Sequence, residues 1–258
     1  MAIAENLGAI FPHESLAARE RRALDTLRAN ARDVVDFLRA ITATDEWQRQ
    51  LFDFDPEGAR LFKTLLADGR GIILVSGHYG NWEIGSVLMR ILNLPLTIVA
   101  MAEANPELNR RRREMREQLG VDTIEVRKSL DTALQIRRRL GDNRIVAMLM
   151  DRHFGRDRVA VTLAGRRAWF LKTPALMGLL TGAPLVPCFI ERTGPSRFSA
   201  GPGDPIFVAT DLPREEAIQR AAQQFADQLS VRLHAHPDYW YHFYPYWDSQ
   251  QDCDNPSA

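Results

Sequence analysis

The chain has 258 residues, which is enough for one large domain with a substantial core or at most two small ones. Apolar residues make up 45% and charged residues 26%, an ordinary globular composition that excludes a disordered chain outside the tail after Trp247. Thirty-three basic residues balance 33 acidic ones, so no overall field favours nucleic acid or a strongly acidic partner.

The two cysteines, Cys188 and Cys253, do not form a disulfide framework, and a reducing compartment fits this usage. Cys188 stands in an apolar run, where a buried, unreactive thiol is expected. No apolar run approaches the roughly eighteen residues of a membrane-spanning helix. Residues 1–15 lack a basic region followed by a long apolar stretch, so no signal peptide is expected.

The first quarter of the chain predicts helices. Between Ser15 and Ile41 the apolar residues fall at helical spacing, arginines and acids fill the other face, and Ser15 is a plausible N-cap. A further helix is expected over residues 56–68. This part of the chain is therefore an amphipathic helical N-terminus.

From Gly71 onward, short apolar runs alternate with helical patterns. The main expected strands are 71–76, 96–100, 123–126, 144–150 and 184–191, and the expected helices are 81–92, 106–119, 129–140, 173–181 and 213–234. This alternation predicts an α/β fold with a mainly parallel sheet flanked by helices. We expect one domain over 1–258, with a helical part (1–68), an α/β core (69–247) and a tail (248–258).

The most informative segment is GIILVSGHYGNWEIG, residues 71–85. A buried strand leads into a glycine-rich turn that contains His78, and ligands of open α/β sheets bind at such turns. His78 and Glu83 are five residues apart, so they would face apart on one regular helix. They can meet if His78 lies in the turn and Glu83 in the first helical turn, with Asn81 as the N-cap.

These residue types suit base catalysis. A neutral imidazole can take a proton from an alcohol near neutral pH, and a carboxylate on the other ring nitrogen fixes the tautomer. The chain has no Gly-x-Ser-x-Gly motif, so the nucleophile is expected to come from the substrate. The alternative is a structural capping pair. A zinc site lacks both a His-Glu-x-x-His motif and cysteine pairs at ligand spacing.

Residues 109–113 and Arg116 form the densest basic cluster. On a helix, Arg110, Arg113 and Arg116 are spaced to share a face, as a clamp for phosphate or carboxylate or as a solvated surface. Arg111 and Arg112 are assigned to solvent. The aromatic residues of 237–247 either lie at a bilayer interface or cover the edge of the sheet.

The segment His78-Tyr79-Gly80-Asn81-Trp82-Glu83 resembles the His-x4-Asp/Glu block of the late acyltransferases of lipid A biosynthesis, in the lysophospholipid acyltransferase superfamily. Further blocks resemble the family's in order, at residues 105–110, 115–116, 150–155, 181–187 and 240–242. The resemblance covers nearly the whole chain.

The resemblance implies His78 as the catalytic base and Glu83 as its catalytic partner. It implies that Arg116 and Asp151 position the substrate or stabilise the transition state. The expected substrate-binding residues are Asn81, Arg110, Arg113, Arg116, Asp151 and Gly155. They include three arginines of the basic cluster and the glycine that ends the block at 150–155. We expect amides of the 77–80 turn or an arginine to stabilise the oxyanion. No metal and no bound organic cofactor is required.

The expected activity is transfer of a fatty acyl group from acyl carrier protein or acyl-CoA to a hydroxyl of a lipid A-type glycolipid precursor. The resemblance also implies lipopolysaccharide biosynthesis at the cytoplasmic face of the cell inner membrane, with peripheral membrane contact and no nucleic-acid partner. Alternative acceptors are a lysophospholipid, another glycolipid or a small metabolite. A thioesterase and a non-catalytic lipid- or carrier-binding protein are the alternatives of other classes.

Three features depart from the family's pattern. The family usually has a membrane-anchoring helix before the catalytic domain, and this sequence begins after that point, so no integral attachment is expected. His153 stands where the third block often carries a second acid, and 243–245 replace basic residues. The last two departures leave the acceptor open.

Overall fold

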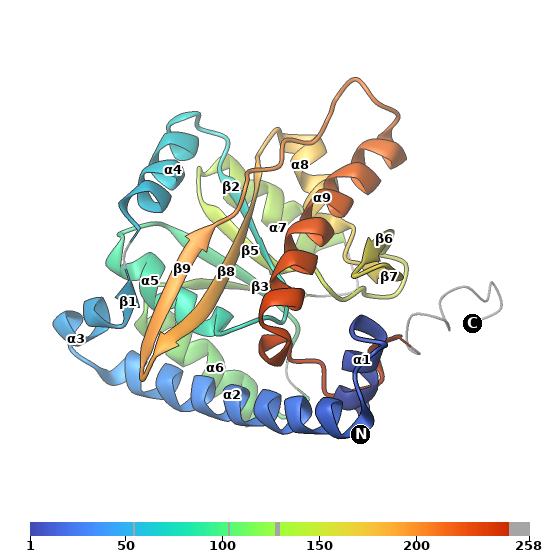
Figure 1. Ribbon diagram of the computed structural model, residues 1–258. Coiled ribbons are helices and arrows are strands. Elements are labelled where there is room, and N and C mark those ends of the chain that lie inside the picture. Colours follow the sequence, from blue (N-terminus) through green and yellow to red (C-terminus); the bar gives the residue numbers. More distant parts are fainter. Residues whose placement is uncertain (54, 103, 127–129, 248–258) are drawn as a thin grey trace.

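The computed structural model describes residues 1–53, 55–102, 104–126 and 130–247 (Figure 1). The expected tail 248–258, with Cys253, lies outside the described residues. The strands are β1 (Phe52–Asp53), β2 (Ile72–Ser76), β3 (Leu96–Ala100), β4 (Asp122–Glu125), β5 (Ile145–Leu149), β6 (Val159–Leu163), β7 (Arg166–Phe170), β8 (Leu185–Gly194) and β9 (Arg197–Pro202).

The α-helices are α1 (Ala2–Ile10), α2 (Leu16–Thr42), α3 (Asp45–Gln50), α4 (Pro56–Ala67), α5 (Gly85–Ile91), α6 (Pro106–Gln118), α7 (Leu130–Gly141), α8 (Thr173–Thr181) and α9 (Arg214–Ala235). Two short 3₁₀ turns are η1 (Trp82–Ile84) and η2 (Pro237–Tyr239). In the described part of the chain, no helix combines the length and the apolar character needed to cross a bilayer.

A seven-stranded sheet in the order β1-β9-β8-β2-β5-β3-β4 forms the centre of the molecule. The pairs β8–β2, β2–β5, β5–β3, β3–β4 and β1–β9 are parallel, and β8–β9 is an antiparallel hairpin. Strands β6 and β7 form a separate antiparallel pair. The predicted α/β fold, with its mainly parallel sheet, is confirmed.

Side chains at the helix starts explain several element boundaries. The Ser15 hydroxyl accepts a hydrogen bond from the Ala18 amide at the start of α2, as predicted. Asp55 and Asn105 cap α4 and α6 in the same way, and each is followed by a proline, which is tolerated in the first helical turn.

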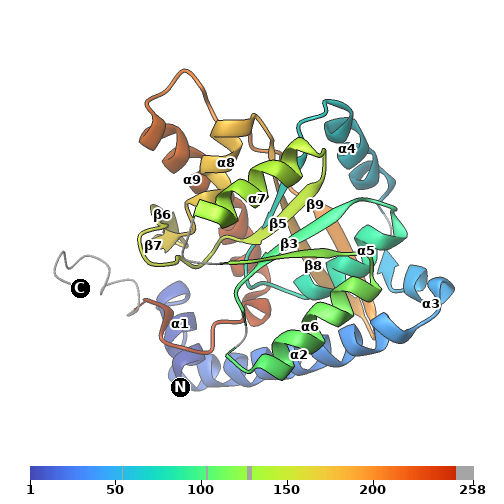
Figure 2. The same cartoon turned by 180° about the vertical axis from the view of Figure 1, so that it is seen from behind.

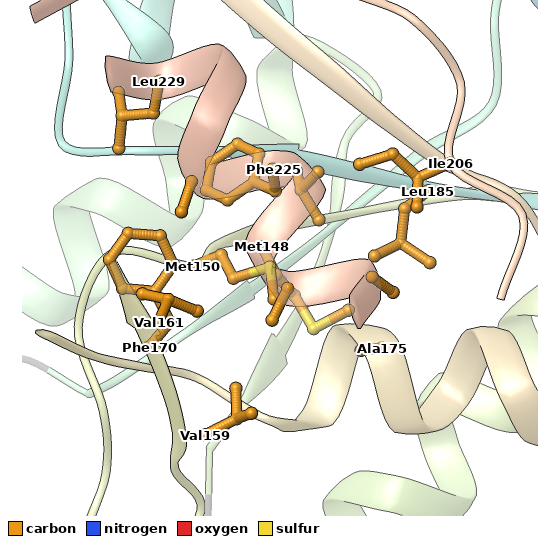
Figure 3. Close-up of a cluster of buried hydrophobic side chains, with 14 of the residues drawn as sticks. Met148, Met150, Val159, Val161, Phe170, Ala175, Leu185, Ile206, Phe225 and Leu229 are labelled. Atoms are coloured by element: carbon orange, nitrogen blue, oxygen red, sulfur yellow. The ribbon is translucent and has the colours of Figure 1, made fainter. Parts of the chain in front are cut away.

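Helices cover both faces of the sheet (Figures 1 and 2). On one face, β2 and β5 contribute Ile73, Val75, Val146 and Met148 to a core that includes buried residues of α7, α8 and α9. Figure 3 shows part of this core, where Phe225 and Leu229 of α9 lie near Met148 and Met150. The other face packs on α3, α4 and α5 through a second buried cluster.

Candidate functional site

The site lies where two neighbouring strands end. β2 and β5 are parallel and in register, with Ser76 opposite Leu149. His78 and Asp151 each follow the last residue of a strand by two positions, so the register brings them to the same edge of the sheet. The turn requires glycine at position 80, where φ is +60° and an added Cβ would clash with the Ile190 carbonyl oxygen.

His78 is bonded to Asp151 twice. The ring Nδ1 lies 2.7 Å from Asp151 Oδ1, and the His78 backbone amide donates to Oδ2 at 2.8 Å. An ionised carboxylate only accepts hydrogen bonds, so Nδ1 carries the proton, and Nε2 of the neutral ring presents a lone pair. Nε2 has no protein partner among the described residues, and His78 borders the cavity described below.

The predicted pairing of His78 with Glu83 is therefore wrong in this structure, because Asp151 holds the ring. Glu83 is turned toward α6 instead, where its Oε1 lies 3.2 Å from Nη2 of Arg116. The base-and-carboxylate arrangement predicted from the sequence is present, with a different carboxylate.

Asp151 is completely buried and accepts four hydrogen bonds. Besides the two from His78, its Oδ2 lies 2.8 Å from Nε2 of His242 and 3.1 Å from Nε1 of Trp240. Burial raises the pKa of Asp151, but interactions with the two histidines outweigh burial and hold this pKa well below its usual value. The carboxylate therefore stays ionised.

His242 is buried beside Asp151. Burial, opposed by the nearby carboxylate, lowers the pKa of His242 to about 4, so the ring is neutral at pH 7. Nε2 then donates to Asp151, and Nδ1 accepts from the Tyr244 hydroxyl at 3.2 Å. A chain of donors thus runs from Tyr244 through His242 to the carboxylate that holds His78.

The side chains of His78, Asp151 and His242 offer ligand atoms within 4.8 Å of one another, close enough to surround a metal ion. Their donor chemistry fits hydrogen bonding better. Both histidine nitrogens lie at hydrogen-bond distance from a carboxylate oxygen, and the Trp240 indole N–H, which can only donate, points at that carboxylate too.

A cavity of about 540 Å³ borders His78. β2, β3, β5 and β8 supply apolar side chains to it, and further lining residues come from α4, α5 and α7. Representative lining residues are Leu74, Ile98, Ala147, Ile190, Phe62 and Leu88. Cys188 is in this wall, and burial raises the pKa of its thiol to about 12, which fits the predicted unreactive thiol.

Near His78 the cavity is lined by Trp82, Glu83 and Arg116. The rings of His78 and Trp82 pack edge to face, with their centroids 5.4 Å apart. Arg116 is 8% exposed, and Arg112 lies 3.9 Å from Glu83. The cavity is therefore apolar along the sheet and carries charged side chains at the catalytic turn.

Helix α6 faces the cavity with a different set of residues from the predicted one. Asn109, Arg112 and Arg116 line the cavity, because positions separated by three and four residues share a helix face. Arg110 pairs outside the cavity with Glu107 and Glu114, and Arg113 faces Glu117. Successive steps of three residues rotate around the helix, so Arg110, Arg113 and Arg116 do not share one face.

Two other expected binding residues serve the backbone. Asn81 is buried, accepts from the Ile84 amide as the predicted N-cap, and donates to the Asp33 carbonyl oxygen on α2. Gly155 lies in a tight turn with φ +55°, between the bridged residues Phe154 and Asp157. Asn81 and Gly155 are not among the described residues that line the cavity.

The C-terminal segment completes the site. The Tyr241 amide donates to the His78 carbonyl oxygen, and the Gly80 amide donates to the Tyr239 carbonyl oxygen. Asn6 of α1 holds this segment in turn, donating to the carbonyl oxygens of His242 and Tyr244. Trp240, Tyr241, Tyr246 and Trp247 are buried here. The Trp-x-His pattern at 240–242 was visible in the sequence, but its contact with Asp151 was not.

A mainly parallel α/β sheet, a histidine–carboxylate pair at its edge and an adjoining apolar cavity form a site that can hold an apolar group beside a general base. The family model of the bacterial lipid A biosynthesis acyltransferases matches residues 2–249. The chain belongs to that family.

Curated relatives carry a related description. The chain is 28% identical over 182 residues to a phosphatidylinositol mannoside acyltransferase of Mycolicibacterium smegmatis, covering 69% of this chain and 57% of the relative. It is 27% identical over 185 residues to a protein of the same description from Mycobacterium tuberculosis, covering 70% and 56%. The chain thus aligns with little more than half the length of these relatives.

Proposed function

We propose that the protein is an O-acyltransferase that moves a fatty acyl group from an acyl thioester to a hydroxyl group of a glycolipid. The observation that carries the proposal is the His78–Asp151 pair, whose imidazole borders a largely apolar cavity. Membership of the family and the names of the two relatives support the same chemistry.

In the proposed reaction, His78 Nε2 takes the proton of the acceptor hydroxyl as its oxygen attacks the thioester carbonyl carbon. Asp151 holds the ring and stabilises the imidazolium that forms. The tetrahedral intermediate then collapses, the carbon–sulfur bond breaks, and His78 returns the proton to the leaving thiolate. The products are an ester and a free thiol, and the side chains end as they began.

The apolar cavity suits the acyl chain. Its walls are aliphatic and aromatic side chains from the sheet, α4 and α5, and it leads to His78. An acyl chain in this cavity would place its thioester carbonyl at the catalytic turn, which is the positioning that transfer requires.

We assign Glu83, Arg112 and Arg116 to the polar part of the substrates. They lie on the cavity wall near His78, and their mixed charge suits hydroxyl and phosphate groups of a glycolipid headgroup. In the catalytic turn, the amides of His78 and Gly80 are already bonded to Asp151 and Tyr239. We therefore assign the oxyanion to an arginine rather than to these two amides.

The donor is an acyl carrier protein or acyl-CoA thioester, and the acceptor is a lipid A-type precursor or a mannosylated phosphatidylinositol lipid. The family's description favours the first acceptor and the descriptions of the relatives favour the second. We place the reaction at the cytoplasmic face of the inner membrane, where such acceptors are expected from the family.

The test incubates purified protein with acyl carrier protein or CoA loaded with labelled chains, together with each acceptor class. Acylated glycolipid should form with the parent protein and fall at least about a thousandfold with His78→Ala, because the proposed general base is removed. Arg138→Ala, a change on the exposed face of α7, is the matched control. Equal transfer by His78→Ala would overturn the proposal. Release of free fatty acid without any acylated acceptor would identify a thioesterase instead.

A further inference from the structure

Helix α2 carries an apolar stripe on its outer side. Six of the fifteen exposed large apolar side chains among the described residues belong to this one helix, and they are 42–66% exposed. We call them the outer stripe: Leu16, Leu24, Leu27, Val34, Val35 and Leu38. Scattered exposed leucines are ordinary, but six large apolar side chains on one face of one helix, interrupted there by the exposed Glu20, indicate a binding surface.

The buried side of α2 explains why the stripe faces outward. The buried positions are small or polar: Ala23, Thr26, Ala29, Asp33, Asp36 and Ala40. Arg192 pairs with Asp33 at 2.6 Å and with Asp36 at 2.7 Å, and Asp33 also accepts from the Tyr241 hydroxyl. Turning the stripe inward would break these buried ion pairs, so the orientation of α2 is fixed.

A row of arginines borders the stripe. Arg21, Arg28, Arg32 and Arg39 are exposed and lie seven, four and seven residues apart, so they follow one line along the helix. Within the described chain, only Arg28 of the four has an ion-pair partner, the exposed Asp25. An apolar stripe flanked by arginines is the pattern of a helix that lies in the interface of an anionic bilayer.

From this pattern we propose that α2 docks the protein on anionic phospholipid, with the outer stripe among the acyl chains and the arginine row on the headgroup phosphates. Figures 1 and 2 show α2 along the lower edge of the molecule in both views. The opposite side of α2 holds the catalytic turn, because Asn81 donates to the Asp33 carbonyl oxygen. Docking would therefore place the site about one helix diameter, roughly 10 Å, from the bilayer surface.

A second copy of the chain fits this surface less well. In an antiparallel two-fold pair of α2 helices, the arginine row would face the same row of the partner copy. In a parallel pair it would face the other flank of the stripe, which carries Arg19, Asn30 and Phe37 and no acid. Neither arrangement gives the arginines a row of carboxylates, whereas an anionic bilayer supplies phosphates along the whole arginine row.

The test is vesicle cosedimentation of the full chain without substrate, so its result does not depend on acyl transfer. Vesicles of phosphatidylethanolamine with phosphatidylglycerol should bind the protein, and vesicles of phosphatidylcholine should bind it much less. Leu27→Glu with Val34→Glu, and separately Arg28→Glu with Arg32→Glu, should each lower binding to the anionic vesicles by about tenfold or more. The positions are exposed, so the thermal unfolding midpoint should not change.

The matched controls are Leu134→Glu and Arg137→Glu with Arg138→Glu on α7, an exposed helix surface away from α2 in both views. These variants should bind vesicles as the parent does. The proposal is overturned if the parent does not bind, if the α2 variants bind like the parent, or if the α7 variants lose binding equally. A dimer in sedimentation velocity that the α2 variants dissociate, without vesicle binding, would assign the stripe to a second copy.

Discussion

At the scale of single residues, the site depends on how one carboxylate is shared. Asp151 accepts from the ring and the amide of His78, from His242 and from Trp240 while fully buried. Removing one donor leaves part of the buried negative charge of Asp151 without a hydrogen bond. The carboxylate then shifts, and it orients and stabilises the His78 ring less well. His242 is therefore a positioning residue that acts through Asp151.

Replacement of His242 tests this role. His242→Phe removes the donor and should lower kcat by about tenfold with little change in KM, because the acyl cavity is untouched. The acidic limb of the pH–rate profile should move to higher pH, since Asp151 loses a compensating donor. His242→Gln, which keeps an N–H donor, should restore part of kcat and move the acidic limb part of the way back. A lower thermal midpoint with an unchanged pH–rate profile would reduce His242 to a structural residue.

At the scale of elements, the sequence predicted the strands and helices well but not their neighbours. Apolar runs and caps located the segments around His78 and Asp151, because burial and capping leave local signals. The adjacency of β2 and β5 is a tertiary fact, and it decides that Asp151 rather than Glu83 meets His78. The same limit applies to α6, where only the packed helix shows that Arg112 borders the cavity.

Strand β5, which lies between β2 and β3, offers a test of the acyl cavity. Ala147 lines the cavity between the strands that carry Leu74 and Ile98. Ala147→Phe should fill part of that space and shift the preference from long-chain to short-chain donors by at least about tenfold in kcat/KM. Ala160→Phe on β6, outside the cavity lining, is the matched control and should leave chain preference unchanged. Equal losses with all chain lengths would place the acyl chain elsewhere.

At the scale of the whole molecule, distant parts of the chain close the site together. α1, near the N-terminus, holds the C-terminal segment through Asn6, and that segment holds the catalytic turn through Tyr241. Because the segment buries His242 as a neutral ring, protonating this ring costs more free energy in the folded chain than in the unfolded chain. Stability is thereby linked to pH.

The direction of this dependence follows from the lowered pKa of His242. The unfolded chain takes up the proton near the ordinary value of 6.5, and the folded chain only near 4, so the unfolded state binds more protons between these values. The free energy of unfolding should fall by about 3 kcal/mol from this group as pH drops from 6.5 to 4. Urea titrations at several pH values measure it, with His242→Gln as the comparison. A parent and variant with parallel pH profiles would contradict the assignment of a neutral buried His242.

The measurement that bears most directly on the account compares kcat/KM for Asp151→Asn and Glu83→Gln in the same acyl-transfer assay. The two changes are matched, since each replaces a carboxylate by its amide near the same imidazole. We expect Asp151→Asn to lose about 10³–10⁴-fold, because the amide no longer fixes the tautomer of His78. Glu83→Gln should lose much less, since Glu83 contacts Arg116 and not the ring. The opposite order, with Glu83→Gln inactive and Asp151→Asn near the parent, would contradict the assignment of Asp151 as the partner of His78.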